Sequence, residues 1–485
     1  MAAALALAVF AVTLGGTFIY DDFDVFANDA RLREPALWGK YWTESYNGGI
    51  DNLYRPLVSM SYAIQWRIHG EQPWAFHFVN SLLHAAVSAL VAELALRLAG
   101  ARVAYVAGAL FAVLPIHVEA VAGVVGRAEL MCALGVVGGL VLLLRRTMTH
   151  PRALAIFGCF ILAALSKEQG MLLPLLILIL ALTQRRGMPD RGPLLTLTLL
   201  LTWSLAGIIV LREAMLPLKF WWDRRLLDWS INPLVRAVGI DHWLMPVSIL
   251  GRYVALLVAP ARLSPDYGGA VIGWTARAND PFLWIGGAAL LVWLIGMIAA
   301  IRRRKGAAAF CLIALALTYG LVSNFAFLIG TNFGERLMYL PSVFFVILAA
   351  MIIASLPARF AVVVTILATV LGAARSVTYA IRWNDRLSFY EYATTRQPGA
   401  VRLWLLLAAE RLHRGDFDGA AQATARGREA LPDYDEIWIQ SAQVAIEQNR
   451  FDDAAMYLER AWSLAKNPAK VVAWQERLAK RRSGR

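Results

Sequence analysis

The sequence predicts an all-α protein in which a polytopic bundle of membrane helices is followed by a short helical solenoid. Its 485 residues are 59% apolar and only 17% charged, with a mean hydropathy of +0.55, which is far from the composition of a soluble domain. Apolar segments that reach or approach the length needed to cross a bilayer recur along most of the chain. The last part of the chain instead repeats one helical pattern at a fixed spacing.

About eleven apolar segments are expected to cross the membrane, because roughly 18 or more apolar residues span the hydrocarbon core. They cover residues 3–19, 77–95, 103–114, 128–144, 153–165, 171–182, 194–211, 282–300, 307–323, 337–354 and 360–371. Lys and Arg collect in the short loops on one side, which is therefore expected to be cytoplasmic. We expect the acidic loops on the outer side, including the large ones at 21–76 and 213–280, together with the C-terminal tail. The segment at 247–260 is expected to dip into or lie along the outer leaflet without crossing.

The sequence argues against a cleaved signal peptide at the N-terminus and against binding of nucleic acid. A cleaved signal peptide at 3–19 would need a charged region before it and small residues at its end, but Phe18, Ile19 and Tyr20 occupy that place. The net charge of +13 is spread over the loops and the tail, so no nucleic acid partner is expected. Trp221, Trp222 and Trp229 are expected to mark an aromatic belt, with an acceptor groove as the alternative.

Residues 400–485 are predicted to form a tetratricopeptide-repeat domain, joined by a junction at 377–399 to the membrane part at 1–376. The recurring pairs are Trp404 and Trp438, Gly415 and Asn449, Phe417 and Phe451, and Ala420 and Ala454. Their common spacing is the ~34-residue period of tetratricopeptide helix pairs. Two units and a partial third near Val471 fall short of the ~3 that such arrays need, so docking on the membrane part or on a partner is expected. A stabilising cap and a protein-binding groove both remain open.

Polar residues gather at the expected outer ends of the spans, beginning with the adjacent acids Asp21 and Asp22. Charged residues at the edge of hydrocarbon cost a few kcal/mol each, so their recurrence on one side predicts a shared polar cavity. The other members are Arg55, His77, Asn80, His117, Glu119, Arg127, Glu129, Lys167, Glu168, Glu335 and Arg336.

The order of these motifs resembles the transmembrane and tetratricopeptide-repeat protein O-mannosyltransferases over the whole chain. The motifs are Asp21-Asp22, Tyr54-Arg55-Pro56-Leu57, His77 with Asn80 and His84, Pro115-Ile116-His117 with Glu119-Ala120-Val121, Gly126-Arg127-Ala128-Glu129, Lys167-Glu168, Glu335-Arg336 with Tyr339-Leu340-Pro341-Ser342, and Arg382-Trp383-Asn384-Asp385. The resemblance implies a GT-C membrane glycosyltransferase that uses a polyprenyl-phosphate sugar, with mannose expected, on the periplasmic or lumenal side. Ala- and Arg-rich usage and lean loops favour a bacterial inner membrane.

Transfer to a Ser or Thr hydroxyl of an exported protein needs a carboxylate base, because an alcohol is a poor nucleophile until its proton is accepted. Asp21 or Asp22 is expected to be that base, with the other acid held by a cation or a metal. A guanidinium is the expected partner of the donor phosphate, and Arg336 is the first candidate, before Arg127 and Arg55. No specific cofactor is assigned, and a divalent metal remains open.

Each site residue has a simpler alternative. The two acids could be a solvated helix exit, and His77, Asn80 and His84 share one helical face that more often makes interhelical hydrogen bonds than a metal site. Buried ion pairs could join Glu129 and Glu168 to Arg127 and Lys167. At the level of function, the alternatives are a GT-C enzyme acting on a lipid or glycan, and a non-enzymatic scaffold or transporter.

Overall fold

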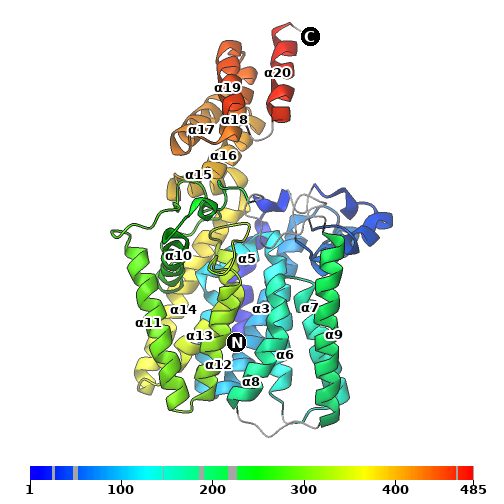
Figure 1. Cartoon of the computed structure of the whole chain (residues 1–485), viewed down its shortest axis with the longest axis vertical. Coiled ribbons are helices and arrows are strands. Elements are labelled where there is room, and N and C mark those ends of the chain that lie inside the picture. The colour runs from blue at the N-terminus through cyan, green and yellow to red at the C-terminus, as the bar shows by residue number, and fades with distance from the viewer. Residues whose placement is uncertain are drawn as a thin grey trace.

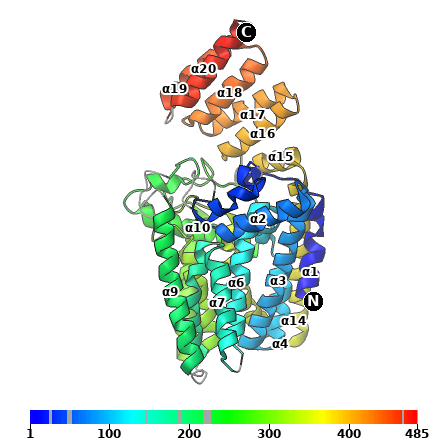
Figure 2. The same ribbon diagram turned by 90° about the vertical axis from the view of Figure 1, so that its right-hand side faces the viewer.

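The computed structural model describes residues 1–23, 28–46, 53–145, 147–184, 191–216, 227–465 and 468–483. Within these ranges the protein is all-α, as predicted. Long helices form a bundle, and the C-terminal helices form a column at one end of it, which we call the tail end (Figures 1 and 2). Trp221 and Trp222 lie outside the described residues.

Six described helical segments are long and apolar enough to cross a membrane, or seven if one bent pair counts as a span. They contain α3 (Pro73–Ala99), α6 (Arg127–Leu143), α9 (Arg191–Met215), α11 (Pro281–Arg302), α13 (Tyr339–Ala354) and α14 (Ala358–Ala380). The bent pair joins α4 (Ala101–Val113) to η5 (Pro115–His117) and α5 (Val118–Ala122) at an angle of 49°. The chain is therefore a multi-pass membrane protein.

The expected count of about eleven crossings is supported only for these six or seven. The other four predicted segments are also helical, but α1 (Ala2–Phe10), α7 (His150–Ala164), α8 (Leu173–Gln184) and α12 (Gly306–Gly320) are shorter than the roughly 20 residues that span hydrocarbon. The sequence pattern identified apolar helices correctly, but it could not show how far each continues. As expected, α10 (Asp241–Val258) is not among the candidate spans.

Small residues let neighbouring helices approach closely. A Cβ added to Gly251 of α10 would lie 1.9 Å from the carbonyl oxygen of Phe282, and one added to Gly286 of α11 would lie 1.9 Å from that of Val247. The two backbones are therefore in direct contact, as is common where membrane helices cross. The basic turn after α11, at Arg302, lies at the end of the bundle opposite the tail (Figure 1).

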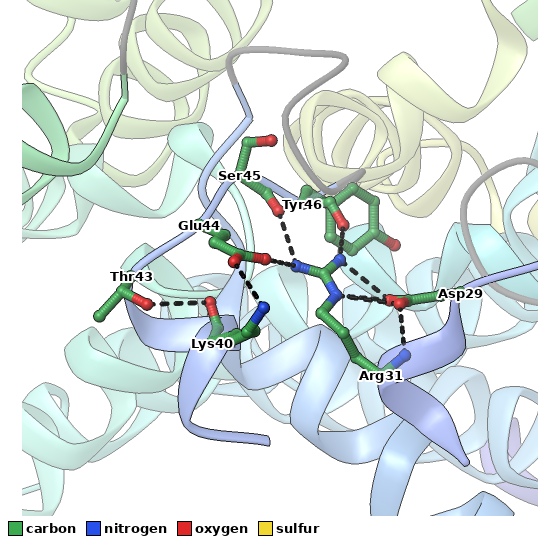
Figure 3. Close-up of polar contacts among 7 residues, drawn as sticks. All are labelled: Asp29, Arg31, Lys40, Thr43, Glu44, Ser45 and Tyr46. Carbon is green, nitrogen blue, oxygen red and sulfur yellow. Dashed lines mark hydrogen bonds and ion pairs between the residues drawn. The ribbon is translucent and has the colours of Figure 1, made fainter. Parts of the chain in front are cut away.

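The segment expected as a loop at 21–76 contains α2 (Pro56–His69) and a compact turn region held by Arg31 (Figure 3). The Arg31 guanidinium bonds both carboxylate oxygens of Asp29, the carboxylate of Glu44, and the carbonyl oxygens of Ser45 and Tyr46. All of its N–H donors are thus used inside the loop. This network holds residues 28–46 together at the tail end.

The tail contains two helix pairs that repeat in structure as well as in sequence. The pairs are α16 (Val401–His413) with α17 (Phe417–Ala430) and α18 (Asp435–Glu447) with α19 (Phe451–Leu464), and they are preceded by α15 (Arg386–Arg396) and followed by α20 (Pro468–Arg482). Trp404 and Trp438 each donate an indole hydrogen bond of 2.8 Å to a proline carbonyl six residues earlier. Gly415 and Asn449, in the turns between paired helices, both have positive φ, at +78° and +59°. The predicted boundary between 376 and 377 lies inside α14.

Candidate active site

Asp21, Arg336 and Glu119 come together from three distant segments at the tail end. Arg336 lies in η10 (Glu335–Met338), directly before α13, Glu119 lies on α5, and Asp21 follows the first apolar segment. Arg336 Nη2 donates to Asp21 Oδ2 at 2.7 Å, and its Nε lies 3.4 Å from Glu119 Oε1. The backbone N–H of Arg336 also donates to Glu119 Oε2, at 2.9 Å.

This cluster is open on one side. The side chain of Asp21 is 21% exposed and that of Arg336 is 28% exposed, whereas that of Glu119 is 2% exposed. Glu119 therefore holds Arg336 from inside the protein, while Asp21 and the outer face of the guanidinium remain accessible. A carboxylate that can accept a proton and a guanidinium that can bind an anionic oxygen lie side by side here.

The neighbouring acid Asp22 has a different environment. It is buried, and its two carboxylate oxygens accept the backbone N–H groups of Val125, at 3.0 Å, and of Ile19, at 3.2 Å. Burial raises the pKa of Asp22 from 3.8 to about 7, although these backbone hydrogen bonds act in the opposite direction. Asp22 thus ties the end of the first segment to η6 (Val124–Gly126).

Glu335 is adjacent to Arg336 but belongs to another set of contacts. It is fully buried, and its Oε1 accepts the N–H of Ser264 at 2.6 Å and the hydroxyl of Tyr267 at 2.7 Å. Its carboxylate therefore braces the segment before α11 and does not face Asp21 as part of the open cluster.

Two ion pairs, one buried and one partly buried, form a second charged cluster. Lys167 pairs with Glu129, and Arg55 Nη2 pairs with Glu168 Oε2 at 2.9 Å. The Arg55 guanidinium also lies over the ring of Tyr46, which connects this cluster to the Arg31 loop. Buried ion pairs were an alternative for these acids, but the partner of Glu168 is Arg55, since folding brings α2 against the segment before α8.

Arg127 and Asn80 are buried in the bundle and bond to each other. Arg127 Nε donates to Asn80 Oδ1 at 3.0 Å, and the guanidinium lies over the ring of Tyr62 at 4.7 Å. Asn80 Nδ2 donates to the carbonyl of Gly123 at 3.0 Å. A phosphate would reach Arg127 only if these contacts were broken. His77 is buried one helical turn before Asn80.

Two further histidines brace the elements that carry Glu119 and Arg336. His84 Nδ1 lies 2.7 Å from the hydroxyl of Tyr339, and His117 Nε2 lies 2.7 Å from Ser342 Oγ. The contact of His84 is thus a hydrogen bond between helices, one of the alternatives for the face of α3 that it shares with His77 and Asn80. Across the described ranges, no three His, Cys, Asp or Glu side chains converge as metal ligands would.

Sequence reasoning missed three residues near Asp21: Tyr20, Tyr390 and Arg402. Tyr20 has positive φ, and it contacts Tyr390 of α15 and Arg402 of α16. These contacts join residues 370 and 382 positions apart, so no local pattern could have indicated them.

Comparison with known proteins relates the chain to protein O-mannosyltransferases. Residues 55–208 match the family model described as dolichyl-phosphate-mannose-protein mannosyltransferase. The chain is 27% identical over 401 residues to protein O-mannosyl-transferase F38B6.6 of Caenorhabditis elegans, covering 78% of this chain and 54% of that protein. It is also 27% identical over 405 residues to human protein O-mannosyl-transferase TMTC4, covering 71% and 53%. The chain thus spans about half the length of these curated relatives.

Among solved structures, the crystal structure of ArnT from Cupriavidus metallidurans bound to undecaprenyl phosphate aligns with 91% of this chain and 79% of that chain. The sequence identity is 16% and the TM-score is 0.45.

Proposed function

We propose that this protein is a GT-C membrane glycosyltransferase that transfers a sugar from a polyprenyl phosphate to Ser or Thr hydroxyls of exported proteins. Mannose is the proposed sugar. The observation that carries the proposal is the accessible pair of Asp21 and Arg336, held by Glu119 at the tail end. The match of residues 55–208 to the mannosyltransferase model and the similarity to protein O-mannosyl-transferases support the same reaction class.

Asp21 is the proposed general base. The acceptor oxygen would bond to the anomeric carbon as the bond from that carbon to the phosphate oxygen breaks, which inverts the configuration. The hydroxyl proton would pass to Asp21, and the electron pair would leave with the lipid phosphate. Asp22 is assigned a structural role, because both of its carboxylate oxygens already accept backbone N–H groups.

Arg336 is the proposed ligand of the leaving phosphate. Its Nη2 contacts Asp21, so a phosphate oxygen that binds this guanidinium would compete with Asp21 and release its carboxylate for the acceptor. Glu119 would keep Arg336 in place through the backbone N–H and Nε. Arg55 is the second candidate, because it is partly exposed, and Arg127 is the most enclosed of the three.

The membrane arrangement is proposed from the charge of the ends of the bundle. The basic turn at Arg302 lies opposite the tail, so the tail end with Asp21 is assigned to the outer side, in the periplasm of a bacterial inner membrane. Residues 1–376 would be the catalytic domain, 377–399 the junction, and 400–485 a tetratricopeptide-repeat domain that presents acceptor proteins. The repeated tryptophan hydrogen bonds and positive-φ turns support this assignment of the tail.

The test is transfer of labelled mannose or glucose from the polyprenyl phosphate to periplasmic protein by the purified chain. Asp21→Asn is expected to lower the transfer rate by roughly 10²–10⁴-fold, the usual contribution of a general base. Glu93→Gln in the partly exposed ion pair of Glu93 with Arg97 on α3, outside both the proposed site and the tail, is the matched control and should retain full activity. No transfer from either donor to protein by the folded, inserted wild type would refute the proposal, and labelling of lipid or glycan instead would assign the alternative acceptor.

A further inference from the structure

Tyr20, the residue before Asp21, has a backbone conformation that bulky residues rarely adopt. Its φ is +59°, in the left-handed region, and its side chain is buried. Such a conformation persists only where surrounding contacts fix it, and it often occurs where a reactive group must be aimed. The direction of the chain into Asp21 therefore depends on whatever holds Tyr20.

The contacts that hold Tyr20 come from the first two helices of the tail. The backbone N–H of Tyr20 donates to the hydroxyl of Tyr390 on α15 at 3.2 Å. Arg402 on α16 donates from Nη1 to the hydroxyl of Tyr20 at 3.3 Å, and its guanidinium lies 5.6 Å from the centre of the Tyr20 ring. Tyr20 is thus held at both its backbone and its side chain.

Neighbouring contacts fix the same helices against the bundle. Arg402 Nη1 lies 3.8 Å from the carboxylate of Asp266, and the N–H of Ala270 donates to the carbonyl of Gly399 at 3.1 Å. On the other side of the two acids, the guanidinium of Arg386 on α15 lies over the ring of Phe23. The segment 20–23 therefore has tail residues against it at both of its ends.

We propose that Tyr390 and Arg402, the tail latch, are positioning residues that orient Asp21 for the reaction. This inference rests on the proposed function, and it assigns to the start of the tail a part of the active site in addition to any role in binding acceptors. If the latch opens, Tyr20 can relax to negative φ, which redirects the chain and moves the Asp21 carboxylate away from Arg336. A displacement of about 1 Å at a reacting group can lower the rate by about 10²-fold.

The test combines turnover with backbone hydrogen exchange in the full-length protein. Tyr390→Phe removes only the hydroxyl that accepts the Tyr20 N–H, and Arg402→Met removes the charge while keeping much of the side-chain volume. Both variants are expected to lower kcat by about 10- to 100-fold with the KM for the lipid donor unchanged, and to speed amide exchange in residues 18–23. Arg402→Lys, which keeps the charge, should recover part of both effects. Tyr105→Phe on the exposed face of α4 lies outside both the proposed site and the tail, so it is the matched control and should change neither.

The outcomes separate the latch from the reaction. If exchange at 18–23 and kcat match the wild type in both Tyr390→Phe and Arg402→Met, the latch is refuted. If instead the variants raise only the KM for the donor, the positioning role is also refuted. A folded wild type that transfers no sugar would overturn the proposed function, and the exchange data would then decide separately whether Tyr390 and Arg402 hold residues 18–23 in place.

Discussion

Asp22→Asn provides a quantitative test of the assignment of Asp22 as a buried anchor. The pKa of Asp22 rises from 3.8 to about 7 on folding, so the folded state holds the proton more tightly than the unfolded state. The contribution of Asp22 to stability is therefore most favourable below about pH 4, declines as the pH rises toward 7, and is constant above that value. The full difference corresponds to roughly 4 kcal/mol.

The amide of Asn cannot titrate, so the variant loses this pH dependence. It also has only one oxygen, so one of the N–H groups of Ile19 and Val125 would face an NH₂ group, at a cost of about 1–3 kcal/mol. At pH 5 the variant should be less stable than the wild type. At pH 8 the charged carboxylate no longer favours the wild type, so the difference should shrink or reverse.

The assay is thermal unfolding in detergent between pH 4.5 and 8, followed by tryptophan fluorescence. The informative quantity is the difference in Tm between wild type and Asp22→Asn, because the other titrating groups are common to both proteins. Asp452→Asn, in which the exposed Asp452 is replaced, should follow the wild type at every pH. A difference for Asp22→Asn that stays constant from pH 5 to pH 8 would refute the buried, titrating anchor.

Two further predictions concern packing inside the bundle. Lys167→Met should destabilise the protein by about 3–5 kcal/mol, because it leaves the Glu129 carboxylate buried without its cation. Adding Glu129→Gln should restore most of that stability. Equal thermal stability of the single and double variants would contradict this prediction. Gly286→Ala should lower the free energy of unfolding by about 1–3 kcal/mol or more, since the new Cβ would lie 1.9 Å from the carbonyl oxygen of Val247. A Cβ added to the neighbouring Gly287 would meet no atom within 4 Å. Gly287→Ala should therefore leave the free energy of unfolding equal to that of the wild type or up to about 1 kcal/mol higher.

Local patterns in the sequence predicted most helices, because apolar composition and repeat spacing act over short distances. The segment predicted at 282–300 lies within α11, and the repeat pairs around Trp404 and Trp438 form equivalent hydrogen bonds. The lengths of the shorter helices were not predictable, since the ends of a helix depend on the turns and partners around it. Hence the number of supported crossings is smaller than the number of apolar segments.

The membership of the site was also easier to predict than its geometry. The sequence placed Asp21, Asp22 and Arg336 in one group, and folding brings Asp21 and Arg336 to 2.7 Å although they are 315 positions apart. It could not separate the two acids, because their difference lies in which backbone N–H groups turn toward Asp22. The contact of Tyr20 with Arg402 depends on the docking of the tail, which no spacing in the sequence encodes.

The arginine-centred turn region has a consequence for redox chemistry. Disulfides stabilise many proteins of oxidising compartments, but here Arg31 joins Asp29, Glu44 and the carbonyl of Tyr46 through hydrogen bonds and ion pairs. The three cysteines of the chain are free thiols and lie in helices α6, α7 and α12. The structure of residues 28–46 therefore does not depend on disulfide formation, and this region should remain folded in reducing buffers.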